Sequence, residues 1–496
     1  MNPSAVLHVL SPLGGGVDRY VRDIVATVSR PQLLWHVGRD AEVLEAPGMG
    51  RQYLPLEPSR VDAQPELLEQ LLRSKGVGLV HLHTVHDAPR QRALQMAQRL
   101  GVPLMVTLHD VLFLRPDAFD SGTPTAERSW TEKIAPVLSG ASAVLAPSHY
   151  LANLARETFP GLDVQVVPNG LDRGRTLRFH ESAEVGCVPG FPRPEFLASK
   201  PQHVVVVLGA IGAHKGADLL RQLPAHLEGS GIVIVVIGYL DQQVYPGWNP
   251  KPHIYVHGPY HPSQTAQLLK AYGAELVLFP NRVPESFSYS LSEAWAAGLP
   301  VLAGPAGAIG ERIAMHGGGW LLEEGFGATE VAKRLRELMQ PAGEAAMARV
   351  RLGLLQPDVN RVPTLATMAE SLEAYYRRYA REAAGESMDA PSVDALLAPS
   401  LDSSLFRQEL AYLADLCDQS DSHAKRQRDF EAEARRWIAK LEGDVANLQA
   451  ELKGEFDQRQ RIAVELGLAQ TAAGAAIHLP HFVNRVLARI FRRARS

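Results

Sequence analysis

The 496-residue chain has little of what marks secreted or nucleic-acid-binding proteins. It contains two cysteines, Cys187 and Cys417, which lie too far apart in the sequence for a disulfide framework or a cysteine metal cluster. A reducing cytoplasm is therefore the expected setting. Basic residues number 50 and acidic residues 54, so the formal charge of −4 provides no overall attraction to nucleic acid.

Long apolar runs are also missing. The longest, Val204 to Ile211 and Ile232 to Ile237, fall far below the roughly 18 residues of a membrane-spanning helix. The first residues have neither the basic nor the apolar region of a signal peptide, and charges follow by Asp18. We expect a cytoplasmic protein of two to four domains that is soluble or attached peripherally to the inner face of a membrane.

Short β-branched runs alternate with helical patterns through the first 345 residues, and this alternation is typical of a parallel sheet with helices on both faces. Prolines and glycines cluster between residues 186 and 201, where a domain boundary is expected. The first series predicts strands at Val6–Leu10, Leu34–Val37, Leu79–His83, Leu104–Leu108, Ala143–Ala146 and Val164–Val167. The second predicts strands at Val204–Gly209, Ile232–Ile237, Ile254–Val256, Leu276–Phe279, Val301–Ala303 and Trp320–Leu322.

The fold class is therefore α/β, with two Rossmann-like domains facing across a cleft and a helical extension behind them. We place the first domain at residues 1–195. The second, at residues 196–384, includes a final helix near Met368 to Ala384. A linker is expected at residues 385–404.

The composition changes after the linker. No proline occurs between Leu405 and Leu466, and apolar residues between Phe430 and Leu452 recur at steps of three and four. That spacing predicts a coiled coil at residues 405–470, either as a hairpin or as a self-associating helix. A solvated polar helix with a narrow packed stripe fits the same pattern.

The last segment, residues 479–496, is rich in arginine. Five arginines and no acid occur between Pro480 and Ser496, and on a helix they fall opposite an apolar arc that includes Val483 and Phe491. This pattern predicts a helix that lies in the plane of a membrane surface. Docking on an acidic surface of the same protein is the alternative.

Two glycine-rich turns follow expected strands. Gly14, Gly15 and Gly16 precede a helix whose first backbone amides are free to bind a ligand oxygen. In the second series, Lys215 stands among glycines after a buried strand and is a candidate phosphate-binding cation. Taken alone, a tight turn explains the three glycines equally well, and an ordinary surface lysine explains Lys215 better.

The strongest local signal is a pair of glutamates eight positions apart at a loop-to-helix junction. Glu285 precedes the helix, beside free amides suited to a diphosphate, while Glu293 lies about one turn inside it. A glutamate in that position can accept both hydroxyls of a ribose. The intervening Ser286, Phe287 and Ser288 belong to the same candidate donor-binding segment.

The sequence resembles the retaining glycosyltransferases of family four, which have the two-domain GT-B fold, through segments that occur in the same order along the chain. The resemblance covers about residues 5–380. The similar segments are Gly14-Gly15-Gly16-Val17-Asp18-Arg19, Val80-His81-Leu82-His83, Thr107-Leu108-His109-Asp110, Ala146-Pro147-Ser148, Val167-Pro168-Asn169-Gly170-Leu171-Asp172, Lys215-Gly216 and the glutamate pair.

The resemblance implies roles for these residues. Glu285 would contact the donor sugar, Glu293 the ribose and Lys215 the diphosphate. Gly15 and Gly16 would line the catalytic cleft. His109 is implied near the donor sugar, where it would help to stabilise the transition state.

One position departs from the family pattern. Ala210 stands where many relatives have arginine after the glycine of the second-domain turn. Arg282 or Arg312 would then supply the missing cation, or the donor would bind more weakly. The sequence leaves these alternatives open.

The implied reaction moves a sugar from a nucleoside diphosphate to a glycan or lipid-linked acceptor, with retention of anomeric configuration. No protein base and no metal or other cofactor is expected, because amides and Lys215 would meet the phosphate charge. The arginine-rich end favours surface-polysaccharide synthesis, such as that of O-antigen or lipopolysaccharide. A nucleotide-sugar 2-epimerase of the same fold and a non-catalytic coiled-coil scaffold are the competing interpretations.

Overall fold

The computed structural model describes residues 3–12, 15–38, 42–47, 52–84, 86–114, 124–172, 203–241, 243, 246–249, 252–260, 262–356, 358 and 361–382. The chain divides into two units, Met1–Asp418 and Gln419–Ser496, and every described residue belongs to the first. The expected linker, coiled coil and basic terminal helix lie outside the described residues. Among the helices in these ranges, none combines the length and the apolar character needed to cross a membrane.

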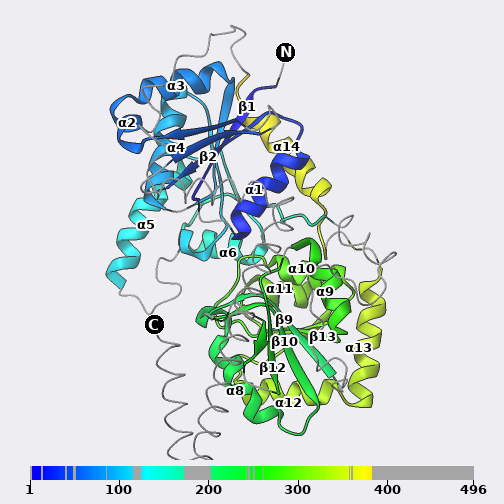
Figure 1. Cartoon of the computed structure of the whole chain (residues 1–496). Coiled ribbons are helices and arrows are strands. Elements are labelled where there is room, and N and C mark those ends of the chain that lie inside the picture. The colour runs from blue at the N-terminus through cyan, green and yellow to red at the C-terminus, as the bar shows by residue number, and fades with distance from the viewer. Residues whose placement is uncertain are drawn as a thin grey trace, which may run out of the picture. The chain divides into compact units, whose positions relative to one another are not determined.

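An eight-stranded sheet forms the first half of the described chain, in the order β4-β3-β2-β1-β5-β6-β7-β8. It is parallel except at one edge, where β3 and β4 run antiparallel. The central strands, of which β1 and β2 are labelled in Figure 1, pair in parallel, so their carboxyl ends lie at the same edge of the sheet. The strands are β1 (Ala5–Leu10), β2 (Gln32–Val37), β3 (Glu42–Ala46), β4 (Gln52–Leu56), β5 (Val77–Leu82), β6 (Leu104–Thr107), β7 (Ala143–Ala146) and β8 (Val164–Val166).

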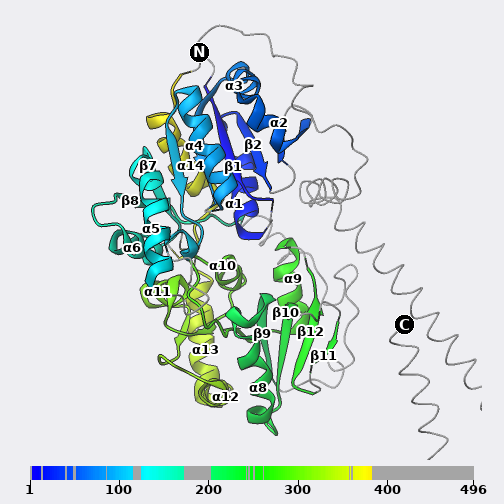
Figure 2. The ribbon, with the colours of Figure 1, turned by 90° about the vertical axis from the view of Figure 1, so that its left-hand side faces the viewer.

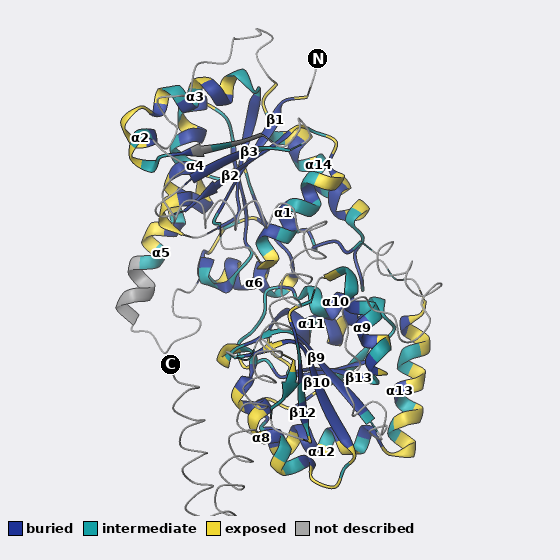
Figure 3. Cartoon of the chain, viewed as in Figure 1, coloured by how far each residue is buried: buried dark blue, intermediate teal, exposed yellow. Residues whose placement is uncertain are grey.

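Helices cover both faces of this sheet because side chains alternate along each strand. Leu7 and Val9 of β1 join the core beneath one set of helices: α2 (Pro58–Ala63), α3 (Pro65–Ser74), α4 (Asp87–Leu100), α5 (Pro124–Ser139) and α6 (His149–Thr158). Val6 and Leu10 face α1 (Gly15–Thr27) and α14 (Leu365–Tyr379) on the other side. The two layers therefore have separate cores. In Figure 3 the strands are mostly buried, while the helices on this sheet have both buried and exposed residues.

A seven-stranded sheet forms the second half, in the order β11-β12-β10-β9-β13-β14-β15. Its strands are β9 (His203–Ile211), β10 (Ile232–Leu240), β11 (Gly247–Trp248), β12 (Ile254–Gly258), β13 (Leu276–Phe279), β14 (Val301–Ala303) and β15 (Gly319–Leu321). Helices α8 (Ala217–Leu227) and α12 (Ala328–Leu338) pack on one face. The other face holds α9 (Thr265–Tyr272), α10 (Tyr289–Ala296) and α11 (Gly307–His316). Figure 2 shows this separation of helices around β9 and β10.

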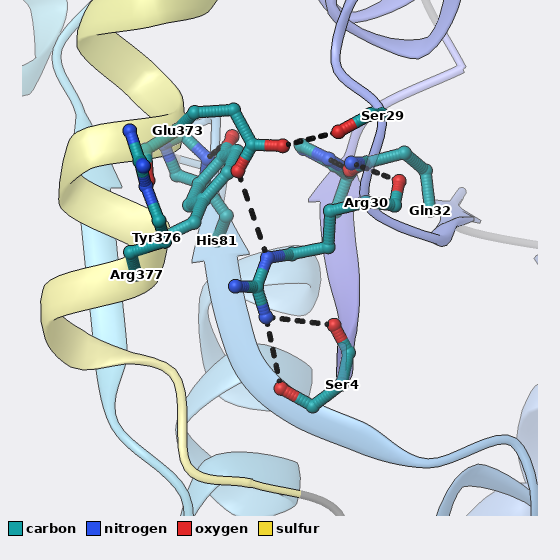
Figure 4. A network of polar contacts seen from close by, with 9 residues as sticks. Ser4, Ser29, Arg30, Gln32, His81, Glu373, Tyr376 and Arg377 are labelled. Atoms are coloured by element: carbon teal, nitrogen blue, oxygen red, sulfur yellow. Dashed lines mark hydrogen bonds and ion pairs between the residues drawn. The ribbon is translucent and has the colours of Figure 1, made fainter. Parts of the chain in front are cut away.

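Helix α14 comes from the end of the second series but packs on the first sheet, beside α1 (Figure 1). Its Tyr376 is fully buried, and the Tyr376 hydroxyl lies 3.0 Å from Nδ1 of His81. Glu373 accepts a hydrogen bond from the Ser29 hydroxyl at 2.9 Å and pairs with Arg30, as Figure 4 shows. These contacts attach the returning chain to the first domain.

The predicted α/β fold of two facing Rossmann-like halves is confirmed. The expected strands are present, with ends that agree or differ by at most three residues. The sequence patterns missed the antiparallel β3 and β4, the helices α2, α5 and α13 (Pro341–Leu354), and the two-residue β11. The limits assigned to the domains stay a prediction.

Candidate active site

The candidate residues follow the carboxyl ends of parallel strands in both halves. Gly15 and Gly16 come after β1, and His109 after β6. Lys215 comes after β9 and Glu285 after β13. Because β1 and β9 are the strands at which the order of each sheet reverses, these ends are the positions where open α/β sheets bind ligands.

Helix α1 begins within the first glycine turn. Gly15 has a φ of +78°, a conformation that glycine adopts without strain. A Cβ built on Gly15 or Gly16 would meet no atom of the described residues within 4 Å, and both positions are exposed. The start of α1 is therefore open, as a surface that approaches a ligand requires.

Lys215 and Glu285 are brought together. The Lys215 Nζ lies 3.1 Å from Oε1 of Glu285, and the Asn281 side-chain amide donates to the same oxygen at 2.9 Å. The next residue, Gly216, packs directly against β13, because a Cβ there would lie 2.0 Å from the Pro280 carbonyl oxygen. Close packing of this turn thus places the lysine beside the glutamate.

The loop after Glu285 contacts the first half of the molecule. The Ser286 hydroxyl donates to the His109 carbonyl oxygen at 2.6 Å, and the Ser148 hydroxyl donates to the Ser286 carbonyl oxygen at 2.7 Å. Ser148 also caps the start of α6. The predicted donor-binding loop is therefore hydrogen-bonded to the segment that contains His109.

Ser288 has an unusual backbone conformation. Its φ is +76°, in the region that residues other than glycine rarely adopt, and its hydroxyl accepts a hydrogen bond from the Leu291 amide at the start of α10. Arg312 holds the loop by donating to the Phe287 and Ser288 carbonyl oxygens, at 3.1 Å each. Buried neighbours that fix a strained loop are characteristic of binding sites.

Arg312 is engaged entirely inside the second half. Its guanidinium also donates to the Ser292 hydroxyl and stacks over the Phe287 ring at 4.2 Å. Burial lowers the pKa of Arg312 to about 9. Arg312 and Arg282 were the two arginines considered as replacements for the cation missing at Ala210. The Arg312 side chain is used to hold the loop, whereas the Arg282 side chain is exposed.

Glu293 is buried, and it already has a cationic partner. The Arg19 guanidinium donates to Oε1 of Glu293 at 2.7 Å, and the Thr265 hydroxyl lies 3.4 Å from the other carboxylate oxygen. Arg19 also lies over the Tyr289 ring, 4.2 Å from its centroid. Arg19 comes from α1, so this ion pair joins the first glycine turn to the ribose-binding candidate.

His109 is partly exposed and adjoins a cluster of buried histidines. Its Nε2 lies 3.1 Å from Nδ1 of His83, whose Nε2 lies 2.8 Å from Nδ1 of His8. Burial lowers the pKa of His109 to about 3 and that of His8 to about 4. His109 is therefore neutral at physiological pH, and it cannot stabilise a transition state by carrying a positive charge.

The nitrogens of His8, His81 and His83 are close enough together to hold a metal ion. All six of these nitrogens have hydrogen-bond partners, however. His81 bonds to Tyr376 and Thr107, and His8 and His83 bond to each other and outward to Gln32 and His109. The arrangement fits a hydrogen-bonded network of neutral imidazoles.

The structure thus places Lys215 beside Glu285, Ser286 beside His109, and Glu293 beside Arg19. The sequence reasoning assigned no role to Arg19 or Ser148, although both lie within the segments that carried the family resemblance. It also missed His8 and Gln32. A signal was available, since a histidine and a glutamine inside short β-branched strands require buried partners.

Two family models match the chain. Residues 14–175 match the model described as Glycosyltransferase Family 4, and residues 192–349 match the model described as Glycosyl transferases group 1. The chain belongs to the glycosyltransferases of family four. The two matches follow each other in the order of the two sheets, and the candidate residues of this glycosyltransferase are distributed over both.

Solved structures share the fold of this glycosyltransferase. HepE of Anabaena, in complex with UDP and glucose, is 16% identical, with a TM-score of 0.55 over 76% of this chain and 100% of that one. Sucrose-phosphate synthase of Thermosynechococcus elongatus is 15% identical, with a TM-score of 0.56 over 76% and 99%. The catalytic domain of starch synthase IV of Arabidopsis thaliana, bound to ADP and acarbose, is 13% identical, with a TM-score of 0.52 over 76% and 99%. No curated protein matches the chain.

Proposed function

We propose that this glycosyltransferase moves a sugar from a nucleoside diphosphate sugar to a glycan or lipid-linked acceptor, with retention of anomeric configuration. The observation that carries the proposal is the contact between Lys215 and Glu285 at the carboxyl ends of β9 and β13, with Glu293 in α10, the helix that follows the same loop. A cation, a loop-to-helix junction and two carboxylates are the groups that a diphosphate and two sugars require.

Each group has a distinct task in this proposal. Lys215 would meet the charge that develops on the departing diphosphate, together with the amides at the helix starts. Glu285 would accept hydroxyls of the transferred sugar. Glu293 would accept the ribose hydroxyls, and His109 would lie against the transferred sugar.

The ion pairs of Glu285 and Glu293 imply that the donor replaces existing contacts. Lys215 would exchange Glu285 for phosphate oxygens, and Arg19 would release Glu293 to the ribose. Both exchanges replace one charge-assisted contact with another, so the exchange of contacts need not cost much free energy. The acceptor hydroxyl would then attack on the face that the diphosphate leaves, and a phosphate oxygen would take its proton.

The acceptor belongs, in our proposal, to bacterial surface-polysaccharide synthesis, including that of O-antigen and lipopolysaccharide. The arginine-rich residues 479–496 support contact with anionic lipid, and the heptad-like spacing before them supports self-association. HepE is similar in fold, and its structures contain UDP with glucose and, separately, UDP-glucose. We therefore include uridine diphosphate sugars among the donors to test.

Product analysis tests the proposal. The protein is incubated with UDP-, GDP-, dTDP- and ADP-sugars, with and without a lipid-linked glycan fraction, and the products are examined by mass spectrometry and by NMR of the anomeric proton. We expect release of a nucleoside diphosphate and a new glycosidic bond of unchanged anomeric configuration. Conversion of the donor sugar without acceptor would support an epimerase, and absence of any turnover would support a scaffold.

A further inference from the structure

A row of hydrogen-bonded side chains runs from inside the first sheet to the candidate site. Gln32 Oε1 lies 2.5 Å from His8 Nε2, His8 Nδ1 lies 2.8 Å from His83 Nε2, and His83 Nδ1 lies 3.1 Å from His109 Nε2. Gln32, His8 and His83 are buried, at 7%, 0% and 1% exposure, whereas His109 is partly exposed. The row thus has one end in the core and one end at the site.

The buried end fixes the direction of the row. The Gln32 side-chain nitrogen donates to the Arg30 carbonyl oxygen at 2.7 Å, so the amide cannot be turned around without placing two oxygens against each other (Figure 4). Its oxygen therefore faces His8. Because that oxygen only accepts, Nε2 of His8 must carry the hydrogen.

The tautomer of His8 determines the tautomers of His83 and His109, because all three imidazoles are neutral. Each has one N–H, and burial lowers the pKa values of all three histidines far enough to keep them neutral. Nδ1 of His8 therefore accepts from Nε2–H of His83, and Nδ1 of His83 accepts from Nε2–H of His109. The Nδ1 atom of His109 is left without a proton.

We propose that Gln32 and His8 are positioning residues that hold His109 in its Nε2–H tautomer, so that its bare Nδ1 accepts a hydrogen bond from a hydroxyl of the bound donor sugar. The proposal rests on the proposed function, which places the donor sugar against His109. The hydrogen bonds of His109 to described residues use Nε2 and the carbonyl oxygen, which leaves Nδ1 for the ligand.

This arrangement selects for a sugar with a hydroxyl at that position. An unprotonated nitrogen accepts a hydrogen bond from a sugar hydroxyl and forms no such bond with a sugar that lacks this hydroxyl. Reversal of the row would place an N–H at Nδ1 and require an acceptor instead. Gln32, inside the first sheet, thereby influences which donor the site prefers.

Nitrogen NMR of the full-length protein labelled with 15N-histidine tests the tautomer directly. We expect the His109 signals, assigned with His109→Asn, to show a protonated Nε2 and an unprotonated Nδ1. Addition of the glucose donor that binds, among UDP-, GDP-, dTDP- and ADP-glucose, should shift the Nδ1 signal as hydrogen bonding does. A protonated Nδ1 in the free protein, or an Nδ1 signal unmoved by a donor that binds, would overturn the proposal.

The Gln32→Met variant tests the role of the buried end. It removes the acceptor from His8 Nε2–H, so the reversed row becomes populated and part of the His109 signal should move to the Nδ1–H form. Because a ground-state contact is lost, the KM for the donor should rise about tenfold with little change in kcat. An unchanged tautomer in a folded Gln32→Met protein would also contradict the proposal.

Thr107→Val is the matched control. It removes the His81 contact at 2.7 Å, at a similarly buried position of the same sheet, and none of the three hydrogen bonds of the row involves Thr107. We expect the His109 tautomer and the KM to stay as in the parent protein. If no nucleotide sugar binds the parent at all, the proposed function and the donor contact both fail, whereas the tautomer measurement stands on its own.

Discussion

Individual side chains already neutralise one another at the candidate site. Glu285 pairs with Lys215, and Glu293 pairs with Arg19. The second pair is the more informative, because Glu293 is buried and Arg19 belongs to the other half of the molecule. A ligand that uses Glu293 must therefore compete with Arg19.

Arg19→Gln should expose this competition. Removing the guanidinium frees the Glu293 carboxylate for ribose hydroxyls, so we expect the nucleoside of the preferred donor to bind about fivefold more tightly. Isothermal titration calorimetry measures the change. Asp23→Asn is the control, since Asp23 forms an ion pair with the same arginine at 3.9 Å. Weaker or unchanged nucleoside binding by Arg19→Gln would mean that Arg19 does not block Glu293.

At the scale of secondary-structure elements, turns and helices position the residues of the site. The Lys215 turn depends on Gly216, which has a φ of +85° and packs against the Pro280 carbonyl oxygen. Gly273, at the end of α9, has a similar φ of +66° but no described atom within 4 Å of a built Cβ. The two glycines share a backbone conformation and differ in the space around them.

Comparison of Gly216→Ala with Gly273→Ala separates these two effects. Gly273→Ala should lower the free energy of unfolding by about 1 kcal/mol, the cost of the left-handed conformation. Gly216→Ala adds a clash with Pro280, and we expect a loss of about 2 to 4 kcal/mol together with loss of donor binding. Urea unfolding provides both values. Equal losses would show that the turn can move away from β13.

Helix α14 depends on its buried tyrosine. Tyr376→Phe keeps the packing but leaves Nδ1 of His81 without its partner, so we expect a loss of about 1 to 3 kcal/mol in the free energy of unfolding. Tyr375→Phe, one position earlier on a partly buried side chain, should change stability little. If both variants unfold at the same urea concentration as the parent, the Tyr376 contact does not hold α14 in place.

Stability of the whole molecule should depend on pH through its buried histidines. Burial lowers the pKa of His8 and of His257 to about 4, and that of His109 to about 3. Between pH 6.5 and about 4 the unfolded chain takes up protons on these imidazoles while the folded chain does not. The free energy of unfolding should therefore decrease as the pH is lowered, by up to about 1.4 kcal/mol per pH unit for each histidine.

Urea unfolding at intervals between pH 7.5 and 5 measures this slope. His8→Gln removes one of the imidazoles. The free energy of unfolding of this variant should therefore depend less steeply on pH, by up to about 1.4 kcal/mol per pH unit, even though the variant is less stable at neutral pH. An identical slope in His8→Gln and parent would show that His8 does not stay neutral in the folded state.

The architecture was predictable because it rests on periodicity. Strands such as Leu276–Phe279 and Val301–Ala303 are short apolar runs between glycine- and proline-containing turns, and their limits agree with the structure. Strand β3 and the edge strand β4 were missed because polar residues interrupt the apolar pattern. Glu42 and Glu45 are buried there through ion pairs with arginines that are remote in the sequence.

The site was predictable only in part. Motif spacing brought Glu285, Glu293 and Lys215 forward as candidates, but it contained no information on which cation each carboxylate meets. Arg19 is 274 residues away from Glu293, and that contact depends on how the two halves pack. The histidine row combines residues of β1, β2 and the ends of β5 and β6, so sheet order had to be known first.

The central claim is that a nucleoside diphosphate sugar binds at Lys215, Glu285 and Glu293. Isothermal titration of UDP-, GDP-, dTDP- and ADP-sugars against the parent protein and the Glu293→Gln and Lys215→Ala variants tests it most directly. We predict that one donor binds the parent and that each variant weakens it at least tenfold. Binding of no donor by the folded parent, or equal binding by all three proteins, would contradict the account.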